Sequence, residues 1–516
     1  MSGTITVSNI GGPRLTLGFD RFDRLDLERH KAVHGKLNTP VLEDLVAMAE
    51  QVDMRGRGGA GFPFARKLTA VAAQITHPTV DQTLLLPGER AGRRRPAEDA
   101  VIVVNGAEGE PGSCKDKVLL TRAPHLVLDG ASIAAAALGT QRIVVAVEDE
   151  EAARSIRAAI VERRMPGRVV RLAERFISGQ AGAVVRAING EVPIPPGQKV
   201  RASESGVGGG PTLLSNTETF AQLAVLTSLG PDLYASAGTE EEPGTTLLTV
   251  GGTRVVEAPY GTPLSAVLGH CEVDAGQGVL VGGYHGMWLD PASVFRAVLS
   301  RSGMRAVNGT VGAGIILPLP QGSCPLGETT RIASYLAAQS AGQCGPCRLG
   351  LPDVVRSLNA LTDGSGSVED VRRAAGIGRG RGACSHPDGT AKFVLSALDA
   401  FAADIEVHRV GGSCGQPVFG VLPLPVPTGD EGRVAIDWSR CDGHGLCAYL
   451  VPELIQLDRY GFPVVLGTDI PPWMERDVQR AVAMCPALAL RITTGVPRDG
   501  KNGKSARNAK NAARRP

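Results

Sequence analysis

Buried strands and helices alternate between residues 101 and 164, and this alternation restricts the fold more than any other feature of the sequence. VIVVNG (101–106) and RIVVAVED (142–149) are short runs rich in β-branched residues, as expected for buried strands. HLVLDGASIAAAALG (125–139) and EEAARSIRAAIVERR (150–164) have the length and apolar spacing of helices. Because strands that alternate with helices form a parallel sheet covered by helices, we predict an α/β domain here.

The composition excludes several classes of protein. The 516 residues, 43% of them hydrophobic and 21% charged, indicate a soluble globular chain of roughly three or four domains. The net charge is +2, so no overall field favours nucleic acid, and no apolar run is long enough to span a membrane. The N-terminus lacks the pattern of a secretion signal, which predicts a cytoplasmic protein. Ten cysteines in such a protein indicate metal or redox chemistry rather than disulfides.

The sequence pattern changes several times along the chain, and each change predicts a boundary. Short strands around one helix follow the α/β domain, and then come a helical stretch, a Pro-rich linker and a small segment with three cysteines. The end of the chain is basic and almost free of apolar residues, so we predict a disordered tail. The predicted divisions are 1–240 (α/β), 241–320 (β-rich), 321–410 (helical), 411–432 (linker), 433–495 (cysteine-containing) and 496–516 (tail).

A glycine-rich loop, MRGRGGAGFPFARK (54–67), follows a predicted helix at 40–53. Gly56, Gly58 and Gly61 fit the spacing G-x-G-x-x-G, but a helix rather than a strand precedes them, so an ordinary Rossmann motif is excluded. Glycines still let backbone N–H groups approach a phosphate, and the loop carries basic residues that would attract one. These basic residues are Arg55, Arg57, Arg66 and Lys67. The alternative is a flexible loop without a ligand.

A second candidate segment, NGAEGEPGSCKDK (105–117), begins where a predicted strand ends. Ligands of open α/β sheets lie at the carboxyl ends of strands, so Asn105 is placed to bind a polar ring edge. Glu110 is suited to accept a hydrogen bond from a ribose hydroxyl or an amide, and Glu108 lies beside it. The alternative is a solvated acidic loop.

Two groups of cysteines have the spacing of metal ligands. Cys344 and Cys347 form a C-x-x-C pair, which is half of a metal site. Cys441 and Cys447 share one loop, and Cys485 precedes a proline further on, which is typical of an iron–sulfur cluster; three buried free thiols are the alternative. Three other cysteines have no partner in the sequence and are predicted to be buried free thiols: Cys114, Cys271 and Cys414.

Four motifs in order resemble the FMN-bearing, NADH-oxidising 51 kDa-type subunit of respiratory complex I and related subunits of soluble hydrogenases and formate dehydrogenases. These motifs are RGRGGAGFPFARK, NGAEGEPGSCKDK, GGGPTLLSNTET and QCGPC, and the resemblance covers about residues 40–400. It implies an FMN-binding α/β domain, a β-grasp (SLBB-like) module and a helical bundle that holds an iron–sulfur cluster. The C-terminal segment resembles the single-cluster ferredoxins of bacterial monooxygenases, which implies an α+β ferredoxin-like domain.

The resemblance also implies roles for individual residues. Phe62 matches the aromatic residue that stacks on the nicotinamide, and Glu110 matches the acid next to the bound dinucleotide, so both are tentative NAD(P)H contacts. The residues that match the FMN site are Gly56, Arg57, Gly58, Gly59, Lys67, Asn105, Glu108, Gly109, Gly179, Gln180 and Asn216.

The dinucleotide half of the implied pocket departs from the family. SGQAGAV (178–184) stands where the family has CGEETAL, so two glutamates are replaced by Gln180 and Ala181. Ala107 replaces an aspartate, and the family's lysine and phenylalanine fall on Gln198 and Arg201. Loss of carboxylates removes repulsion toward a ribose 2′-phosphate, and Arg201 would attract one, so one hypothesis is that NADPH is accepted. The other is that no dinucleotide binds and electrons are exchanged with a protein partner.

The family's four-cysteine cluster motif is reduced to three here. Ala341 stands at the first position, whereas Cys344, Cys347 and the distant Cys384 are kept. Three thiolates suit a [3Fe–4S] cluster, or a [4Fe–4S] cluster with His386 or water as the fourth ligand, and an empty site is the third alternative. Zinc would suit the same ligands. Cys324 is a further candidate ligand that no spacing requires.

The ferredoxin-type segment has a similar ambiguity. His444 occupies the middle position of its cysteine motif, so the cluster held by Cys441, Cys447 and Cys485 is predicted to be [3Fe–4S], or [4Fe–4S] with His444 as the fourth ligand.

Together these features predict a flavin and iron–sulfur protein that moves electrons between NAD(P)H, FMN, iron–sulfur clusters and a redox protein partner. No catalytic side chain is assigned, because a direct hydride transfer requires none. The partners implied are subunits of a larger or membrane-associated complex, which would place the chain in the cytoplasm or at the inner face of a membrane. One alternative is an electron-relay subunit that has lost its own NADH oxidation; another is a structural relic that holds zinc.

Overall fold

The structure is a computed structural model that describes residues 4–76, 95–197, 200–425 and 432–494, except 453, 459, 466–469 and 471–473. The chain divides into two compact units, 1–424 and 425–516, and each is described by itself. Gln198, the last part of the predicted linker (426–431) and the predicted tail (496–516) lie outside the described residues. The six predicted domain boundaries stay predictions.

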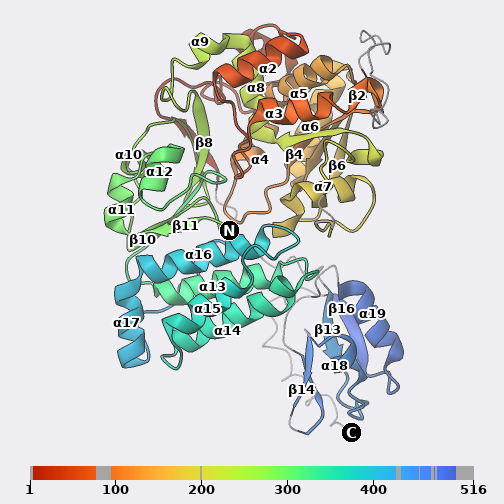
Figure 1. The fold of residues 1–516 in the computed structure, drawn as a ribbon, viewed down its shortest axis with the longest axis vertical. Coiled ribbons are helices and arrows are strands. Elements are labelled where there is room, and N and C mark those ends of the chain that lie inside the picture. Colours follow the sequence, from red (N-terminus) through yellow and green to blue (C-terminus); the bar gives the residue numbers. More distant parts are fainter. Residues whose placement is uncertain are drawn as a thin grey trace, which may run out of the picture. The chain divides into compact units, whose positions relative to one another are not determined.

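The predicted parallel sheet is present in the first unit, with four strands in the order β6-β5-β4-β7. Alternate side chains of its central strands enter different cores: Ile102 and Val104 pack with α5 and α8, whereas Val101 and Val103 pack with α7. Both faces are therefore covered, as the continuous apolar runs predict (Figure 1). The strands are β4 (Val101–Gly106), β5 (Ile143–Val147), β6 (Gly167–Arg171) and β7 (Thr212–Asn216).

Helices α5 and α8 approach each other closely because the contact residue on α5 is Gly130. A Cβ atom at this position would lie 1.8 Å from the carbonyl oxygen of Phe220, so only glycine allows the two backbones to touch. The helices of this part are α1 (Leu27–His34), α2 (Leu42–Gln51), α3 (Phe64–Ala72), α4 (Lys115–Arg122), α5 (Pro124–Leu138), α6 (Glu150–Arg163), α7 (Ala181–Ile188), α8 (Thr217–Leu229) and α9 (Pro231–Tyr234).

A second, mixed sheet follows, with six strands in the order β1-β9-β8-β12-β10-β11. Its first strand comes from the N-terminus and pairs in parallel with β9, so residues 6–9 join a sheet that is otherwise built from residues 245–319. Three helices cover one face of this sheet: α10 (Leu264–His270), α11 (Pro291–Arg296) and α12 (Arg301–Ala306). The strands are β1 (Thr6–Asn9), β8 (Thr245–Val250), β9 (Arg254–Pro259), β10 (Gly278–Val281), β11 (Met287–Leu289) and β12 (Ile315–Leu319); β2 (Ile75–Thr76) and β3 (Arg95–Pro96) form a separate pair.

The other face of this sheet packs against a helical bundle. Tyr284 and Trp288 contact the bundle residues Phe393 and Phe401, which joins the two cores into one. The bundle confirms the helical pattern predicted for this stretch of the chain. Its helices are α13 (Pro325–Ala338), α14 (Leu351–Thr362), α15 (Val368–Ile377), α16 (His386–Ala400) and α17 (Ala402–Gly411), with a π-helical turn at Pro346–Gly350.

The second unit is small. Strands β13 (Gly432–Ile436) and β16 (Leu490–Thr494) pair antiparallel, as do β14 (Ile455–Leu457) and β15 (Pro463–Val465). Helices α18 (Leu446–Leu450) and α19 (Glu475–Met484) complete it. The second unit thus combines strands and helices, and its ferredoxin-like fold stays a prediction.

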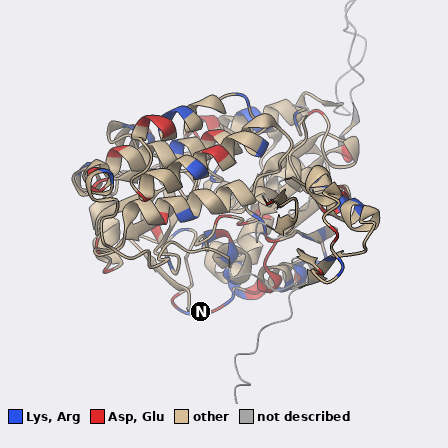
Figure 2. Cartoon of the chain, turned by 90° about the horizontal axis from the view of Figure 1, so that it is seen from below, with Lys and Arg blue, Asp and Glu red and all other residues tan. Residues whose placement is uncertain are grey.

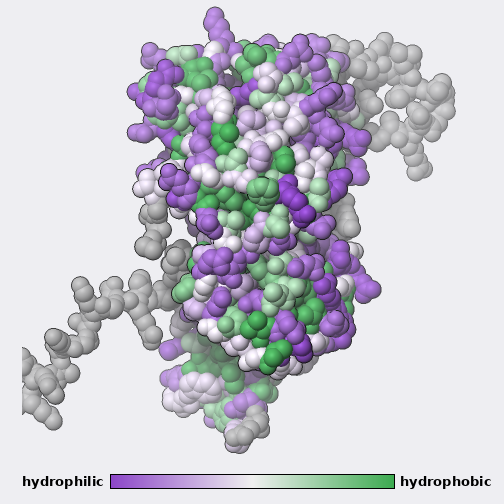
Figure 3. All heavy atoms as spheres, turned by 90° about the vertical axis from the view of Figure 1, so that its left-hand side faces the viewer, coloured by the Kyte–Doolittle hydropathy of each residue, from purple (hydrophilic) through white to green (hydrophobic). Residues whose placement is uncertain are grey.

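The exterior is mixed in character. Acidic and basic residues are interspersed on the helices, in keeping with the small net charge (Figure 2). On the face shown in Figure 3, hydrophobic residues lie among hydrophilic ones. Among the described residues, no helix is both long and apolar enough to cross a bilayer.

Candidate functional site

The glycine-rich loop between α2 and α3 is a tight hairpin. Arg55 and Pro63 form a β-bridge, and the backbone N–H of Gly56 donates to the carbonyl of Phe62 at 2.9 Å. Gly59 (φ +96°) has a left-handed backbone conformation that other residues adopt only with strain. Gly59 and Gly61 (φ +58°) are thus favoured by the turn itself.

This hairpin lies against the end of the parallel sheet. The Arg57 N–H donates to Thr219 Oγ1 at 2.9 Å, and a Cβ atom on Gly58 would lie 3.3 Å from Cβ of Asn216. Two motifs that are far apart in the sequence therefore meet here, as the predicted FMN site requires. The Arg57 guanidinium lies 4.8 Å from the centre of the Tyr260 ring, so its side chain is directed to the second sheet.

Two predicted residues, Asn105 and Asn216, are direct neighbours in register at the carboxyl ends of β4 and β7. The Asn105 amide donates to the carbonyl of Gly179 at 2.9 Å. The Asn216 oxygen accepts from the N–H of Glu218 at 3.0 Å and so caps α8. Asn105, Gly179 and Asn216 thus gather at one edge of the sheet, where ligands of such sheets bind.

The acidic residues of the second motif, NGAEGEPGSCKDK, form hydrogen bonds with other parts of the protein. Glu108 accepts from the N–H groups of Asp116 (3.0 Å) and Lys117 (2.8 Å) and thereby caps α4. Gly109 allows the chain to pass the backbone of Arg175, because a Cβ atom there would lie 2.4 Å from that residue's carbonyl oxygen. The roles of Glu108 and Gly109 in FMN binding stay predictions.

Glu110 is docked on a loop of the second sheet. Its carboxylate accepts from the N–H of Tyr284 at 3.0 Å and also from that of His285. Burial raises the pKa of Glu110 to about 7, although these two hydrogen bonds lower it. Glu110 and Phe62, the two residues predicted to contact NAD(P)H, do not line the same cavity.

A cavity of about 920 Å³ lies between α3, α7 and β7. Phe62 lines it with 46% of its surface exposed, and Lys67 lies 6.0 Å from the centre of the Phe62 ring. The Lys67 ammonium donates to the carbonyl of Leu214 at 3.1 Å, and burial lowers its pKa. The exposed Arg66 and Arg201 line the same cavity, which is therefore rich in positive charge.

A second cavity of about 330 Å³ lies on the other side of the glycine loop. Gly56, Arg57 and Gly59 line it together with Tyr260 and residues 309–314. The predicted FMN residues are therefore divided between the two sides of the loop and the adjoining sheet edge.

A buried charge network below the sheet edge was not predicted. The Lys115 ammonium lies 3.1 Å from Asp116 Oδ1 and 2.9 Å from Glu218 Oε2, and all three side chains are buried. Asp116 also accepts from the Asn216 amide, which ties the network to the candidate site. Burial raises the pKa of Asp116 to about 7 even though Lys115 lowers it. In the sequence this segment reads as a charged surface stretch, so no local signal indicated burial.

Glu148, at the carboxyl end of β5, was also missed. It is 6% exposed, and its Oε1 atom has no hydrogen-bond partner in the part of the chain that the structure describes. Burial, followed by the nearby charges of Glu108 and Glu174, raises its pKa to about 8. The sheet edge therefore holds a carboxyl group that is neutral over most of the physiological pH range.

We expect Glu148→Gln to stabilise the protein increasingly as the pH rises. Since the folded pKa of about 8 exceeds the ordinary value of 4.5, the native state keeps a proton that the unfolded chain loses. The free energy of unfolding of the wild type therefore falls between about pH 4.5 and pH 8, and a neutral glutamine removes this loss. Thermal unfolding at pH 5 and pH 8.5 tests this: the variant should exceed the wild type only at the higher pH. An equal difference at both values would contradict the buried, protonated state.

The three cysteines predicted for the helical bundle lie together. Cys344 and Cys347 flank the start of the π-helical turn, and the N–H of Cys347 donates to the carbonyl of Cys344 at 3.0 Å. Burial and the adjacent Cys344 and Cys384 raise the pKa of Cys347. Burial also raises the pKa of Cys384, whereas hydrogen bonds from the backbone N–H of His386 and from the Gln180 side chain lower it. Gln180 therefore connects the thiols to the start of α7.

The interpretation of His386 as a fourth cluster ligand is not supported. The ring is buried, its Nε2 atom hydrogen-bonds the carbonyl of Leu336 at 2.8 Å, and its Nδ1 atom lies 3.1 Å from Nε2 of His285. Both nitrogens are thus engaged within the protein. Ala341, at the position of the family's other cysteine, is buried and offers no ligand.

In the second unit, Cys441, Cys447 and Cys485 also approach one another. Burial and the charges of Cys441 and Cys485 raise the pKa of Cys447. His444 is exposed between Gly443 (φ +71°) and Gly445 (φ +72°), on the same loop as Cys441. The structure thus brings the predicted thiol ligands together and leaves the role of His444 a prediction.

Comparisons with known proteins agree with this geometry. Residues 49–225 match the Nuo51 FMN-binding domain, residues 328–408 the NADH-ubiquinone oxidoreductase-F iron-sulfur binding region, and residues 434–492 a 4Fe-4S single cluster domain. These matches define a flavin and iron–sulfur electron-transfer protein, and they confirm the predicted FMN-binding region and the two iron–sulfur regions.

Within this class the chain is a relative of the F subunit of NADH-quinone oxidoreductase, as the motifs predicted. The NADH-quinone oxidoreductase F subunit of Mycobacterium tuberculosis (strain ATCC 25618 / H37Rv) is 26% identical over 77% of this chain and 91% of its own length. HndC, a component of the NADP-reducing hydrogenase of Solidesulfovibrio fructosivorans, is 25% identical over 81% of this chain and 84% of its own length. The crystal structure of an NAD⁺-reducing [NiFe]-hydrogenase in the air-oxidised state shows the same fold, with a TM-score of 0.64 and 22% identity over 81% of this chain and 71% of that one.

Proposed function

We propose that this chain is an NAD(P)H dehydrogenase that delivers electrons through iron–sulfur clusters to a redox protein partner. FMN, when bound, supplies the conversion between a hydride donor and one-electron carriers. Cys344, Cys347 and Cys384 would hold one cluster, and Cys441, Cys447 and Cys485 the other. The work of the protein is to bind the dinucleotide, exclude water and tune the clusters through burial and hydrogen bonds to sulfur, such as the bond from Gln180 to Cys384.

The cavity of about 920 Å³ is the observation that carries this proposal. It is large enough for a sizeable ligand, and it pairs a half-exposed aromatic ring with several cationic side chains. The ring of Phe62 offers a flat face for a nicotinamide, and Arg66 and Arg201 offer charge for phosphates. Since the carboxylates of related sequences are replaced by Gln180 and Ala181, we propose that NADPH is accepted as well as NADH.

The residues at the sheet edge also suit FMN. A Cβ atom on Gly61 would meet no atom within 4 Å, so the loop leaves open space for a ligand to approach its backbone. Next to the sheet edge, Ser178 Oγ and Ser215 Oγ are buried and lack hydrogen-bond partners among the described residues. A bound ligand could form these hydrogen bonds. We propose that FMN is held by the glycine loop, by Lys67 and by the edge formed by Asn105, Gly179, Gln180 and Asn216.

Anaerobic titration of the purified holoprotein, first with NADH and then with NADPH, tests the activity. Bleaching of the flavin absorption band is expected with both nucleotides. Bleaching by neither nucleotide, with FMN bound, would overturn the dehydrogenase proposal and favour the relay subunit, which exchanges electrons only through a protein partner.

We expect Phe62→Ala to weaken the use of NADH about 2- to 10-fold, because the stacking of two aromatic rings contributes about 0.5–1.5 kcal/mol. The loss should appear in KM rather than in kcat if the ring acts only in binding. Phe295→Ala is a matched control, because this phenylalanine is 80% exposed on α11 and lies outside the cavity. Equal kinetics of the two variants would remove Phe62 from the nucleotide site.

The proposal of a redox protein partner is based on the related proteins. The F protein of NADH-quinone oxidoreductase and HndC are each named as one subunit of an enzyme, so we propose that this chain also works beside other redox proteins. This would place it in the cytoplasm, or at the inner face of a membrane through a partner.

A further inference from the structure

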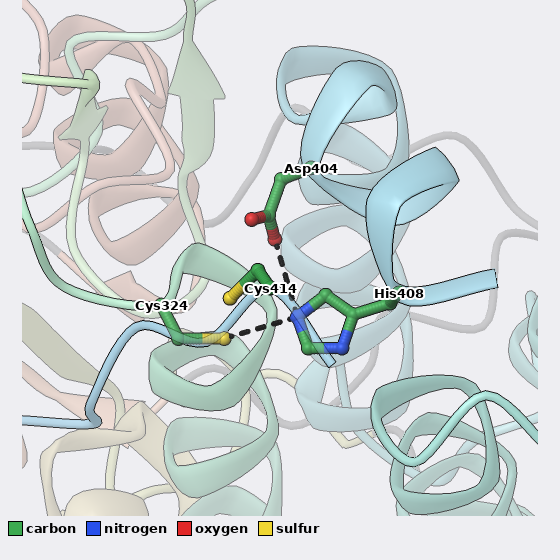
Figure 4. A group of neighbouring side chains, drawn as sticks. All are labelled: Cys324, Asp404, His408 and Cys414. Carbon is green, nitrogen blue, oxygen red and sulfur yellow. Dashed lines mark hydrogen bonds and ion pairs between the residues drawn. The ribbon is translucent and has the colours of Figure 1, made fainter. Parts of the chain in front are cut away.

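Four side chains that take no part in the flavin or iron–sulfur sites converge in the helical bundle (Figure 4). Cys324 stands at the start of α13, Asp404 and His408 lie one turn apart on α17, and Cys414 follows the end of α17. Their donor atoms all lie within 4.8 Å of one another. The sequence suggested Cys324 alone as a candidate ligand, because Cys324 and Cys414 are far apart in the chain.

His408 is held in the orientation of a metal ligand. Its ring is 2% exposed, and its Nδ1 atom lies 2.6 Å from the carbonyl oxygen of Thr362, which fixes the proton on Nδ1. The lone pair of Nε2 therefore faces the group, 3.3 Å from Cys324 Sγ and 3.7 Å from Asp404 Oδ2. Histidines that bind metals commonly donate their other N–H to a backbone carbonyl in this way.

The other three side chains have no positive charge beside them within this group. Oδ2 of Asp404 is buried without a hydrogen-bond partner in the described part of the chain. The Cys324 sulfur accepts from the N–H of Gly327 at 3.2 Å, at the N-terminus of α13, where a thiolate is favoured. No basic side chain other than His408 belongs to this group, so a cation would satisfy it.

We propose that Cys324, Asp404, His408 and Cys414 bind a structural zinc ion. Two sulfurs, one imidazole and one carboxylate match the ligands and the fourfold coordination that zinc prefers, and all four positions come from the protein. Two thiolates would suit an iron–sulfur cluster only together with two histidines, whereas this group has a single histidine and a carboxylate, which favours a single ion.

The segment after α17 begins at residue 412. The ion would attach this segment to the start of α13. After Cys414 this segment runs along α13: Pro417 accepts from the N–H of Cys324 at 2.9 Å, and Gly420 donates to Glu328 at 2.6 Å. A zinc bond between Cys414 and the bundle would therefore hold the beginning of residues 412–424 in place, which is a structural and not a catalytic role.

Zinc analysis of the purified holoprotein tests the proposal independently of flavin or activity. We expect one tightly held zinc ion per chain, with X-ray absorption showing two sulfur ligands at about 2.3 Å and two nitrogen or oxygen ligands at about 2.0–2.2 Å. Cys414→Ser, in which the changed residue lies on a partly exposed segment, should lower the zinc affinity by at least about 10–100-fold. Cys271→Ser changes a buried thiol elsewhere and should keep the ion.

Two further variants and peptide mapping distinguish the proposed zinc site from zinc bound elsewhere, from misfolding and from a disulfide. Cys441→Ser should leave the zinc content unchanged, which excludes misloading of the second unit's thiols. Asp404→Asn keeps the shape of the side chain, so a loss of zinc in this variant does not depend on misfolding. Zinc that is absent from the wild type after reconstitution, or retained in Cys414→Ser, overturns the proposal. So does a disulfide between Cys324 and Cys414 in peptide maps of protein purified under reducing conditions.

Discussion

Lys115→Met is expected to lower the free energy of unfolding of the first unit by about 3–5 kcal/mol, because it leaves two buried carboxylates without their cation. Lys115 contacts Asp116 and Glu218, and all three side chains are almost fully buried. The Glu218 carboxylate is held further by the N–H of Leu247 at 3.0 Å, so it cannot turn to solvent. The same change should release FMN, since Asn216 donates to Asp116.

The loss in Lys115→Met should depend on pH. Burial already raises the pKa of Asp116 to about 7, and removal of Lys115 raises it further. The native variant then binds protons that the unfolded chain loses, so its stability falls as the pH rises through this range. Hydrogen exchange of the α4 and α8 amides at pH 6 and pH 8 measures the loss of stability and its pH dependence. The amount of flavin that stays bound to the purified variant measures the release of FMN.

Lys117→Met is the matched control for this prediction. Lys117 lies on the same helix, but it is partly exposed, and so are its partners Asp149 and Glu151, so the expected cost is at most about 1 kcal/mol. If the two variants lost equal stability, or if the loss did not change with pH, the buried network would contribute little.

Local patterns predicted the parallel sheet well because each strand is a short, continuous apolar run between turn residues. The predicted strand 101–106 coincides with β4, and the strand at 142–149 contains β5. That Asn105 and Asn216 meet follows from a general rule, since parallel strands end at one edge of a sheet. The sequence could not show which strands are neighbours, and the structure gives their order.

Contacts between distant segments escaped prediction. β1 pairs with β9, although the N-terminal residues were assigned to the α/β domain. Cys414 was interpreted as a free thiol, but its sulfur lies close to Cys324 and His408. Such contacts depend on how helices and strands pack, and short spacings such as C-x-x-C reveal only ligands that share one loop.

The burial of polar residues was also not predicted from the sequence. Glu148 follows an apolar strand and precedes a charged helix, which is the pattern of an exposed strand end. Lys115 and Asp116 lie in a segment with the composition of a surface loop. They are buried because α4 packs between two sheets, and composition alone cannot show that their charges compensate one another.

Cys384→Ser is expected to remove the iron–sulfur cluster of the bundle while FMN is retained. Only Cys344 and Cys347 would then remain, and a serine hydroxyl is a poor replacement for a soft thiolate. His386 cannot compensate, because both of its ring nitrogens are engaged by Leu336 and His285. Iron and sulfide analysis and EPR of the reduced protein should show the loss of one cluster, with an unchanged flavin band.

The same variant tests the order of electron flow. If electrons pass from the flavin through the bundle cluster to the second unit, reduction by NADH of the cluster at Cys441, Cys447 and Cys485 should slow by at least about 10–100-fold, whereas flavin bleaching persists. Cys271→Ser is the control, because this buried thiol lies in the core of the second sheet. Cys441→Ser should remove the other EPR signal and leave that of the bundle. An unaltered rate of reduction in Cys384→Ser would mean that electrons reach the second unit without the bundle cluster.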